Sequence, residues 1–247
     1  MAIAHAIHPL VKLFKAVDIS LFPPACPACQ KRLNTEESFL CHDCQTSCLQ
    51  QPTTYCPRCG HAHPATTKQN HLCSHCLTSS PPFNWLKAAG IYQGQLAELL
   101  QQFKFHHKTS LASPLADLIL HQHQQAIDQF AADAIVPIPL HPQRLRERGY
   151  NQAQLIGQQL ARHLNLPVNG SLVLRNRPTP PQSTLSLTQR MDNMRSVFYS
   201  PEARPSKILL IDDIATTTST ARACSRALTQ RGHKVAVLVV ARALPRH

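Results

Sequence analysis

The 247-residue sequence is poor in aromatic residues, in glycine and in long apolar runs. Aromatic residues make up 5% of the chain, which argues against extensive base stacking as a way of holding nucleic acid. No apolar run reaches the roughly eighteen residues that a transmembrane helix needs, so membrane insertion is not expected. The first 21 residues also lack an apolar stretch followed by a small-residue cleavage site. A cytoplasmic protein is therefore predicted.

Cysteine and charge, by contrast, are present in quantity and are distributed unevenly. Nine of the 10 cysteines precede residue 77. Residues 85–247 carry 19 Lys/Arg and 9 Asp/Glu, a net charge of +10, whereas residues 1–84 carry 6 and 4, a net charge of +2. These two breaks predict two domains, a Cys-rich one with an N-terminal helix at 1–84 and a second at 85–247. The basic excess favours polyanionic partners such as nucleic acid or phosphorylated metabolites, and a merely solvated basic surface is the alternative.

The first domain contains four Cys-x-x-Cys pairs in succession. A two-residue gap places two thiolates on one turn, where both can reach a single tetrahedral Zn²⁺. Two such pairs complete a closed shell of four thiolates, which is typical of structural zinc. The predicted ligands, grouped sequentially rather than cross-braced because short ribbon loops then suffice, are Cys26, Cys29, Cys41 and Cys44 for one ion, and Cys56, Cys59, Cys73 and Cys76 for the other.

A disulfide framework or a redox Cys-x-x-Cys is the alternative for these pairs, and a cytoplasmic protein with four repeated pairs favours zinc. Cys48 falls outside the pattern and is predicted to be a spare. Gly60, directly after a ligand, is expected to adopt a positive φ in the metal-binding turn. Because a module this small cannot fold on its own apolar core, metal binding is expected to supply its folding energy.

The second domain alternates continuous apolar segments with amphipathic ones. Strands are predicted at 134–139, 207–212 and 235–240, and helices at 151–164 and 218–231. Helical periodicity also occurs in Leu96, Leu99, Leu100 and Phe103, and in Leu111, Leu115, Leu118 and Ile119. Apolar strands alternating with helices predict an α/β fold with a parallel sheet covered on both faces.

The segment from Ile208 to Thr220 combines a buried strand, two acids and a hydroxyl-rich loop that opens a helix. In an open α/β sheet, ligands bind beyond the carboxyl ends of the strands. The backbone amides and hydroxyls of such a loop suit a phosphate, and Asp212 and Asp213 suit the hydroxyls of a ribose. Capping of the helix by Asp213 and the threonines is the plain structural alternative.

This segment resembles the 5-phosphoribosyl-1-pyrophosphate (PRPP) motif of type I phosphoribosyltransferases, which have a Rossmann-like α/β fold. Further stretches, together with the double zinc ribbon, narrow the resemblance to the ComF family over nearly the whole chain. They are Val136-Pro-Ile-Pro-Leu, Arg146-Glu-Arg-Gly-Tyr-Asn-Gln, Thr179-Pro-Pro-Gln-Ser-Thr-Leu and Arg190-Met-Asp-Asn-Met-Arg-Ser-Val-Phe.

The resemblance implies a role for each part of the motif. Asp212 and Asp213 would contact the ribose hydroxyls, and Arg146 and Arg148 would face the pyrophosphate or a nucleic-acid backbone. The 5′-phosphate would lie on a loop formed by Ala215, Thr216, Thr217, Thr218, Ser219 and Thr220. A flexible loop closing over the site would carry Arg175, Arg177, Gln182, Arg190 and Arg195. Most relatives have glycine where this chain has Thr218, and glycine there lets the backbone turn tightly around phosphate.

The resemblance also implies two different functions. In the first, the protein is a competence factor for uptake or use of external DNA. Its partners would be single-stranded DNA, a DNA-translocating helicase and other competence proteins, and its phosphate-binding fold would serve as a platform. Arginines would then track the DNA backbone: Arg144, Arg146, Arg148, Arg175, Arg177, Arg190 and Arg195. In the second, it is an active phosphoribosyltransferase that uses Mg²⁺ and PRPP on an acceptor for which the sequence announces no pocket.

Overall fold

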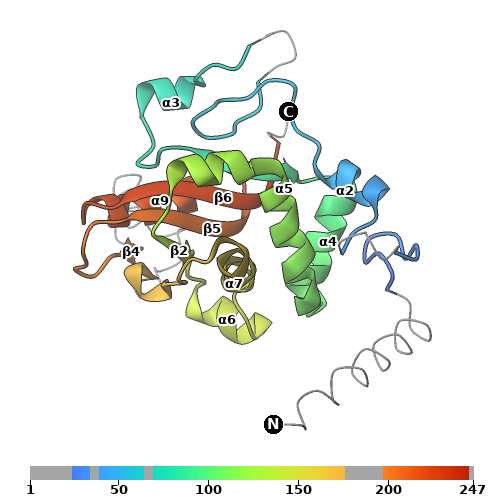
Figure 1. Ribbon diagram of the computed structural model, residues 1–247. Helices are drawn as coiled ribbons and strands as arrows, with labels where there is room; N and C mark the ends of the chain where they lie inside the picture. Colours follow the sequence, from blue (N-terminus) through green and yellow to red (C-terminus); the bar gives the residue numbers. More distant parts are fainter. Residues whose placement is uncertain (1–23, 34–38, 64–68, 176–196, 245–247) are drawn as a thin grey trace, which may run out of the picture.

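A computed structural model describes residues 24–33, 39–63, 69–175 and 197–244 of the chain (Figure 1). The predicted helix in residues 1–21 lies outside the described residues. So do Arg177, Gln182, Arg190 and Arg195 of the predicted flexible loop. No helix in the described ranges is both long enough and apolar enough to cross a membrane.

The sheet has four strands in the order β1-β6-β5-β2, and every pair is parallel. The strands are β1 (Leu86–Ile91), β2 (Ala134–Pro137), β5 (Lys207–Ala215) and β6 (Lys234–Arg242). The two central strands, β5 and β6, are continuous apolar runs because both of their faces are covered by helices. The predicted α/β fold with a parallel sheet is therefore confirmed.

Helices cover both faces of this sheet (Figure 1). One face carries α5 (Ala112–Phe130) and α7 (Gln152–Leu164), with α4 (Gly94–Phe105) beside them. The other carries α9 (Ser219–Thr229) and the small antiparallel pair β3 (Leu174–Arg175) and β4 (Phe198–Tyr199). The short helix α6 (Pro142–Arg148) follows β2, and the 3₁₀ turns η1 (Thr109–Leu111) and η2 (Gly170–Leu172) precede α5 and β3.

The apolar periodicities predicted the helices correctly. Leu96, Leu99, Leu100 and Phe103 are all buried on one side of α4. The helix predicted at 151–164 is α7, whose N-cap Asn151 accepts a hydrogen bond from the amide of Ala153. Strands β5 and β6 extend beyond their predicted ends at 212 and 240. β1 was missed, because its Ala-Ala-Gly core has little β propensity.

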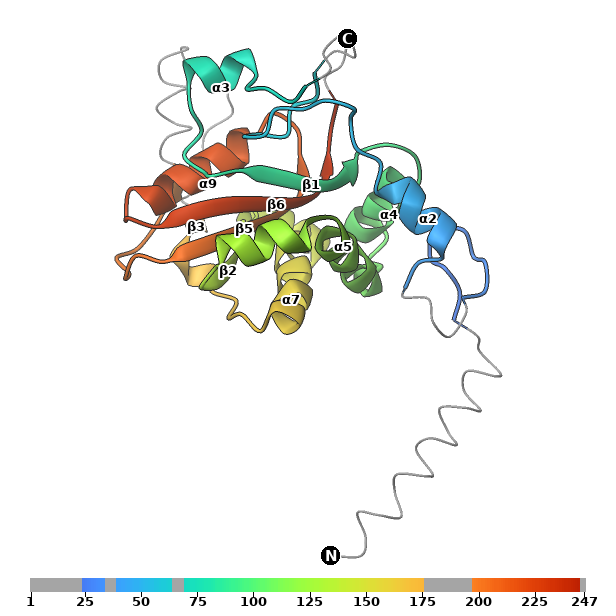
Figure 2. The same ribbon diagram turned by 45° about the horizontal axis from the view of Figure 1, so that its top comes forward.

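The double zinc ribbon wraps around the free edge of β1 (Figure 2). Its helices are α2 (His42–Cys48) and α3 (Ser74–Thr78). Between them the chain runs along β1: the Ile91 amide donates to the Gln50 carbonyl at 3.1 Å, and the Leu86 amide donates to the Arg58 carbonyl at 2.9 Å. The backbone groups of an edge strand are thereby paired, which protects them from pairing with another chain.

The two ribbons consequently pack on opposite faces of the sheet. The cysteines of the first ribbon share an apolar cluster with α4, α5 and α7. Those of the second share a cluster with Phe83 and Leu86, the other face of the sheet and α9. Each zinc ribbon is thus part of one of the two apolar clusters of the α/β domain. The predicted division at residues 84/85 therefore separates two segments of sequence that pack against each other.

Candidate metal centres and phosphate-binding site

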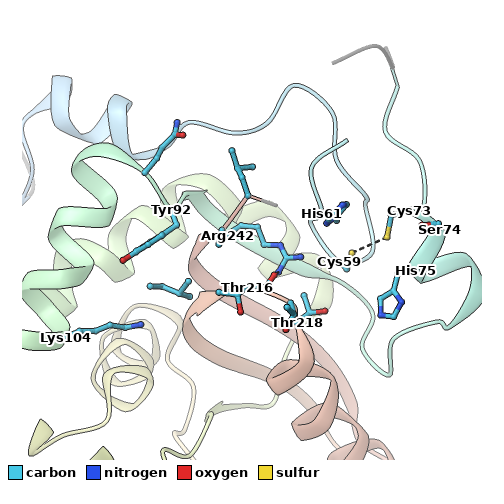
Figure 3. A pocket seen from close by; sticks show the side chains of 15 residues that line it. Cys59, His61, Cys73, Ser74, His75, Tyr92, Lys104, Thr216, Thr218 and Arg242 are labelled. Atoms are coloured by element: carbon cyan, nitrogen blue, oxygen red, sulfur yellow. Dashed lines mark hydrogen bonds between the residues drawn. The ribbon is translucent and has the colours of Figure 1, made fainter. Parts of the chain in front are cut away.

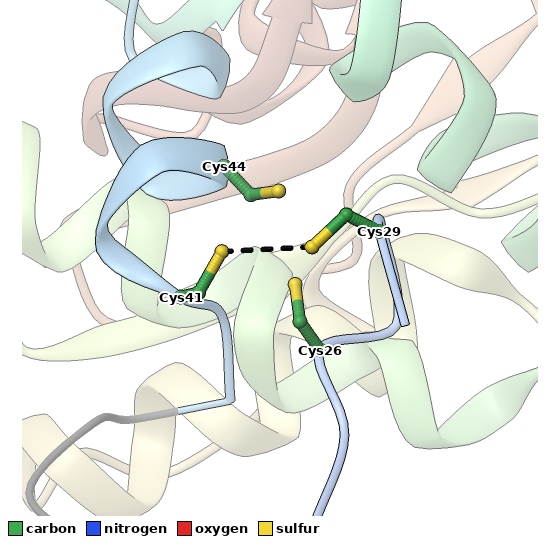
Figure 4. A group of neighbouring side chains, drawn as sticks. All are labelled: Cys26, Cys29, Cys41 and Cys44. Atoms are coloured by element: carbon green, nitrogen blue, oxygen red, sulfur yellow. Dashed lines mark hydrogen bonds between the residues drawn. The ribbon is translucent and has the colours of Figure 1, made fainter. Parts of the chain in front are cut away.

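The first cysteine cluster brings together Cys26, Cys29, Cys41 and Cys44 (Figure 4). All four Sγ atoms lie within 4.8 Å of one another, and those of Cys29 and Cys41 are 3.7 Å apart. A tetrahedral Zn²⁺ with Zn–S bonds of about 2.3 Å requires Sγ atoms about 3.8 Å apart. The donor set and its spacing therefore fit a structural zinc ion.

The second cluster repeats this construction with Cys56, Cys59, Cys73 and Cys76, all four of them buried. The Sγ atoms of Cys59 and Cys73 are 3.7 Å apart. All ten cysteines of the chain are free thiols. The structure therefore groups the first pair with the second and the third with the fourth, as the sequential arrangement predicts. Because four thiolates leave no open position on the ion, both sites are of the structural kind.

Each ribbon presents its ligands from one tight turn and one helix start. In the first turn the Gln30 amide donates to the Cys26 carbonyl, and Gln30 has φ of 64°. In the second, the Gly60 amide donates to the Cys56 carbonyl with φ of 67°, the positive value predicted for this residue. The other two ligand pairs begin at the N-caps of α2 and α3, Cys41 and Cys73.

Metal analysis is expected to find about two zinc ions per chain, one for each closed set of four thiolates. The double substitution Cys29→Ser/Cys44→Ser should reduce the content to about one. Cys48→Ser is the matched control, since Cys48 is buried beside the first cluster yet is not among its four ligands, and this variant should keep both ions. A wild-type content of one, or loss of zinc from Cys48→Ser, would contradict the assignment.

The acid pair, Asp212 and Asp213, lies near the carboxyl end of β5, and the side chains of both acids form hydrogen bonds or an ion pair. Asp213 is buried, and one of its carboxylate oxygens forms an ion pair with Lys104 Nζ at 2.8 Å. Its other oxygen accepts a hydrogen bond from the Ile214 amide at 2.6 Å. Asp212 Oδ1 accepts from the Asp213 amide at 2.9 Å. Lys104 lies on α4, so a lysine that is distant in sequence neutralises part of the negative charge of the acid pair.

The Asp212 carboxyl group has a strongly raised pKa. Burial, and next the charge of Asp213, raise the pKa of Asp212 to about 8. The Asp213 amide and Lys104 act in the opposite direction. Asp212 is therefore largely protonated at neutral pH, while Asp213 is ion-paired with Lys104. With little net charge at the two acids, the site repels a phosphorylated ligand only weakly.

The hydroxyl loop follows directly and leads into α9. Thr216 and Thr217 are exposed, and the hydroxyls of Thr217 and Ser219 are 3.0 Å apart. Thr218, the N-cap, is buried and adopts the left-handed conformation, with φ of 62°. β-Branched residues rarely adopt this conformation, which is natural for glycine. The loop thus keeps the backbone shape of the glycine-containing motif and bears strain at Thr218.

Thr218→Gly is expected to relieve this strain and raise the free energy of unfolding by about 1 kcal/mol, because the cost of a left-handed β-branched residue exceeds the flexibility that glycine adds. Denaturant unfolding of the zinc-loaded protein measures the change. Thr217→Gly is the matched control, since Thr217 does not have a positive φ, and it should lower stability instead. Equal effects of the two substitutions would show that Thr218 is unstrained.

A cavity of about 1290 Å³ opens between this loop and the second zinc ribbon (Figure 3). The cavity is lined by Thr216, Thr217 and Thr218 and, on the ribbon side, by His61, Ser74 and His75. Arg242 lies near Thr216, and Lys104 lies on the side of the threonines that faces away from the ribbon. Its lining carries two permanent positive charges and no acidic side chain, which favours an anionic ligand. The predicted phosphate loop therefore faces a cationic cavity that is walled in part by the zinc ribbon.

The remaining predicted arginines lie elsewhere. Arg146 is exposed on α6, and Arg148 contacts Gln152 and the ring of Phe105. Neither arginine lines the cavity. Arg175 is half-buried on β3, with its guanidinium 5.5 Å from the centre of the Phe198 ring. Arg146 and Arg148 thus lie outside the lining of the cavity at the phosphate loop. Of the two roles that the resemblance implies for them, contact with a pyrophosphate or with a nucleic-acid backbone, both stay predictions.

Two cations at the site, Lys104 and Arg242, were missed by the sequence reasoning. Lys104 occupies a helical position that would be solvent-exposed in an isolated amphipathic helix. Arg242 ends the apolar run of β6, and its guanidinium donates to the Thr216 carbonyl at 2.6 Å. The position of Arg242 at the end of a buried strand was the one local signal for a functional cation, because charged residues are rarely buried without a partner.

Fold and site together define a zinc-ribbon protein whose parallel α/β sheet ends in an acid pair and a hydroxyl loop. Residues 17–77 match the family described as the double zinc ribbon domain. Competence protein F of Haemophilus influenzae is 30% identical over 87% of this chain and 94% of its own. DNA utilization protein YhgH of Escherichia coli is 32% identical over 85% and 92%, and competence protein ComFC of Bacillus subtilis 26% over 80% and 81%. The chain belongs to this ComF family of competence and DNA utilization proteins.

Solved structures similar to the chain include two phosphoribosyltransferases. Orotate phosphoribosyltransferase from Aeropyrum pernix is 18% identical, with a TM-score of 0.32 over 54% of this chain and 60% of its own. Adenine phosphoribosyltransferase from Saccharomyces cerevisiae is 17% identical, with a TM-score of 0.35 over 55% and 72%.

Proposed function

We propose that this protein is a cytoplasmic competence factor for DNA uptake or use, which binds a phosphorylated ribose at the end of β5 and single-stranded DNA on a basic surface. The proposal rests chiefly on the hydroxyl loop, which directly follows the acid pair and lines a cavity together with Lys104, the ion-pair partner of Asp213, and Arg242. The names of its relatives, competence protein F and DNA utilization protein, support the biological role.

For a sugar phosphate such as PRPP, each part of the site has a defined task. The loop from Ala215 to Thr220 offers hydroxyls and the free amides of the α9 N-terminus to the 5′-phosphate. The carboxylate of Asp213 accepts a hydrogen bond from a ribose hydroxyl. Asp212 donates a hydrogen bond when it is protonated and accepts one when it is ionised. Lys104, which forms an ion pair with Asp213 and lines the cavity, attracts the negative charge of the phosphate groups.

Mg²⁺ does not fit as an ion held by the chain alone at this site. Both oxygens of Asp213 already have partners, the Lys104 ammonium and the Ile214 amide. Within the described ranges, the only groups of three or more metal-binding side chains are the two cysteine clusters. Mg²⁺ is usually bound through one or two carboxylates together with the phosphates of a substrate, so here it would arrive with the pyrophosphate.

Single-stranded DNA is assigned to the surface around α6. Arg144 and Arg146 are exposed there, and Arg144 is close enough to Arg175 to lower its pKa, in the same direction as the larger effect of burial. Two arginines held close together, with no ion pair to a carboxylate among the described residues, favour a polyanion. A DNA-translocating helicase and other competence proteins are the protein partners proposed with this role.

An active phosphoribosyltransferase is the second candidate, and the intact acid pair favours it. Transfer at the anomeric carbon of ribose depends mostly on positioning and on charge stabilisation, so it needs a phosphate cradle, acids and cations. The residues for all three are present. Space for an acceptor exists in the cavity between the loop and the second ribbon.

Titration calorimetry with PRPP, with and without Mg²⁺, tests the proposal. The wild type is expected to release or absorb heat, and Asp212→Ala/Asp213→Ala is expected to weaken binding by at least about tenfold, as loss of charged hydrogen-bonding groups does. DNA binding is measured in parallel by fluorescence anisotropy at several salt concentrations. Arg144→Ala/Arg146→Ala should weaken it and reduce its salt dependence.

Arg162→Ala is the matched control for DNA, because Arg162 lies on α7 and donates to Gln159 on the same helix. Absence of heat with PRPP in both the wild type and the acid-pair variant would refute the phosphate site and the enzyme together. DNA binding that is unchanged in Arg144→Ala/Arg146→Ala would refute the α6 surface while leaving the phosphate site standing.

A further inference from the structure

The second zinc ribbon is flanked by two buried arginines that come from the α/β domain. Arg242 ends β6 and has 6% of its surface exposed, and Arg222 lies in α9 with 9% exposed. Arg222 donates to the Cys76 Sγ atom at 3.9 Å and to the Ser79 carbonyl at 3.0 Å. Arg242 lines the same cavity as Cys59 and Cys73 (Figure 3). Arginines buried to this degree require a negative partner.

A zinc ion with four thiolates supplies that partner. It carries a net charge of about −2, which two guanidinium groups can balance. No carboxylate forms an ion pair with either arginine among the described residues, and the Nε atoms of both are buried without a hydrogen-bond partner. Burial lowers the pKa of Arg242, and the charges of the four cysteines of the second cluster act in the opposite direction. The cluster is therefore the negative charge that these arginines face.

Both arginines also connect to the phosphate loop, Arg242 through its side chain and Arg222 through its helix. The guanidinium of Arg242 donates to the Thr216 carbonyl at 2.6 Å. Arg222 lies in the first turn of α9, which begins at the loop residue Thr218, and its backbone amide donates to the Thr218 carbonyl at 2.8 Å as the first hydrogen bond of that helix. The Arg222 side chain thus joins the second cluster to the helix on which the loop ends. Among the described residues, no arginine donates to a cysteine of the first cluster, which packs against α4, α5 and α7 on the opposite face.

We propose that Arg222 and Arg242 are positioning residues that link the second zinc–thiolate cluster to the loop at 216–218, so that zinc retention at this cluster and the conformation of the loop depend on each other. With zinc bound, both guanidinium groups are neutralised and the loop is held in shape. When zinc leaves and the cluster loses its order, the two buried guanidinium groups lose the partner that they face and reorient, and the Thr216 carbonyl loses its donor. The consequence for a phosphorylated ligand rests on the proposed function; the link itself does not.

Zinc release to a chromophoric chelator tests the link without any ligand. The wild type is expected to lose its two zinc ions in two phases, and Arg242→Gln and Arg222→Gln should accelerate one phase by about tenfold or more, the usual effect of removing a group that supports metal ligands. Arg242→Lys should restore most of the retention, because it keeps the charge without the planar fork. Arg226→Gln, an exposed position on the same helix, is the control.

Hydrogen exchange of the backbone amides gives a second readout. In Arg242→Gln the segment 215–222 should exchange faster than in the wild type, whereas 207–211 in the centre of β5 should be unchanged. Unchanged release of both zinc ions, or equal acceleration of both, overturns the proposal, since equal acceleration would reflect general destabilisation. Faster release with unchanged exchange in 215–222 also overturns it.

Ribose 5-phosphate separates this inference from the proposed function. If it binds by calorimetry, reciprocity requires it to raise the equilibrium affinity for zinc of the arginine-linked cluster, measured by competition with the chelator, and to leave that of the other cluster unchanged. Binding without such a rise in zinc affinity overturns the coupling to the ligand. If it does not bind to the wild type at all, the proposed phosphate site fails, while the release and exchange measurements still decide whether the arginines join the cluster to the loop.

Discussion

Gly90→Ala is expected to lower the free energy of unfolding by about 3 kcal/mol or more, the upper part of the range for overpacking. Gly90 lies in β1 where the first ribbon crosses the edge of the sheet. A Cβ atom there would be 1.9 Å from the Cys48 carbonyl oxygen and 2.8 Å from Leu96 Cδ2. The carbonyl belongs to backbone, which can move only if the ribbon separates from the strand. Thermal unfolding with saturating zinc should show a fall of roughly 6–12 °C.

Gly170→Ala is the matched control, since an added Cβ there would meet its nearest atom at 3.7 Å, an ordinary contact. It should change the midpoint little. The strain of Gly90→Ala arises where β1 meets the end of α2 and Leu96 of α4, outside the four ligands of either cluster, so its zinc content should remain at about two. A Gly90→Ala variant as stable as Gly170→Ala would show that the ribbon is not packed on β1 as described.

Asp212→Asn is expected to remove a pH dependence from the stability of the protein. The pKa of Asp212 is raised to about 8 in the folded state, against about 3.9 in an unfolded chain. The folded state therefore binds a proton that the unfolded state has released, and wild-type stability falls as pH rises through this interval, becoming flat above about 8. Asparagine resembles the protonated carboxyl and does not titrate, so the variant should lack the fall.

Thermal unfolding between pH 6 and pH 9, where zinc thiolates persist, measures this difference. The midpoint of Asp212→Asn should exceed that of the wild type at pH 8.5 by on the order of 5 °C, with a smaller excess at pH 6. Asp213→Asn is the control: it leaves Lys104 without its partner and should lower stability. Parallel profiles for the wild type and Asp212→Asn would mean that Asp212 titrates at its ordinary pKa.

The double zinc ribbon, the α/β class and the family could all be inferred from local patterns. A Cys-x-x-Cys pair places both ligands on one turn whatever surrounds it, so the eight cysteines could be assigned to zinc before any fold was known. The apolar runs in β5 and β6 are continuous because each strand is buried on both faces. Consecutive apolar residues are visible in the sequence, so these two strands could be predicted. The order of strand, acid pair, hydroxyl loop and helix around Asp212 and Asp213 is local in the same sense.

The neighbours of the phosphate loop could not be inferred in this way. Lys104 lies more than a hundred residues before its partner Asp213, and Arg222 lies equally far from Cys76. A lysine on a helix and an arginine beside an apolar run each look like solvated charges until the sheet order is known. β1 was missed for a related reason: its Ala-Ala-Gly segment is small because the ribbon packs on it, and only that contact explains the composition.

Local patterns are enough to assign the zinc ligands, to predict a parallel sheet and to place an acid pair before a hydroxyl loop, because each depends on residues only a few positions apart. The arrangement of the two ribbons on opposite faces of the sheet, with the second lining the cavity at the loop, becomes known only from the folded chain. Arg222, Arg242 and Lys104, which are buried or half-buried, are positioned by partners that folding brings within reach and that lie far away in the sequence.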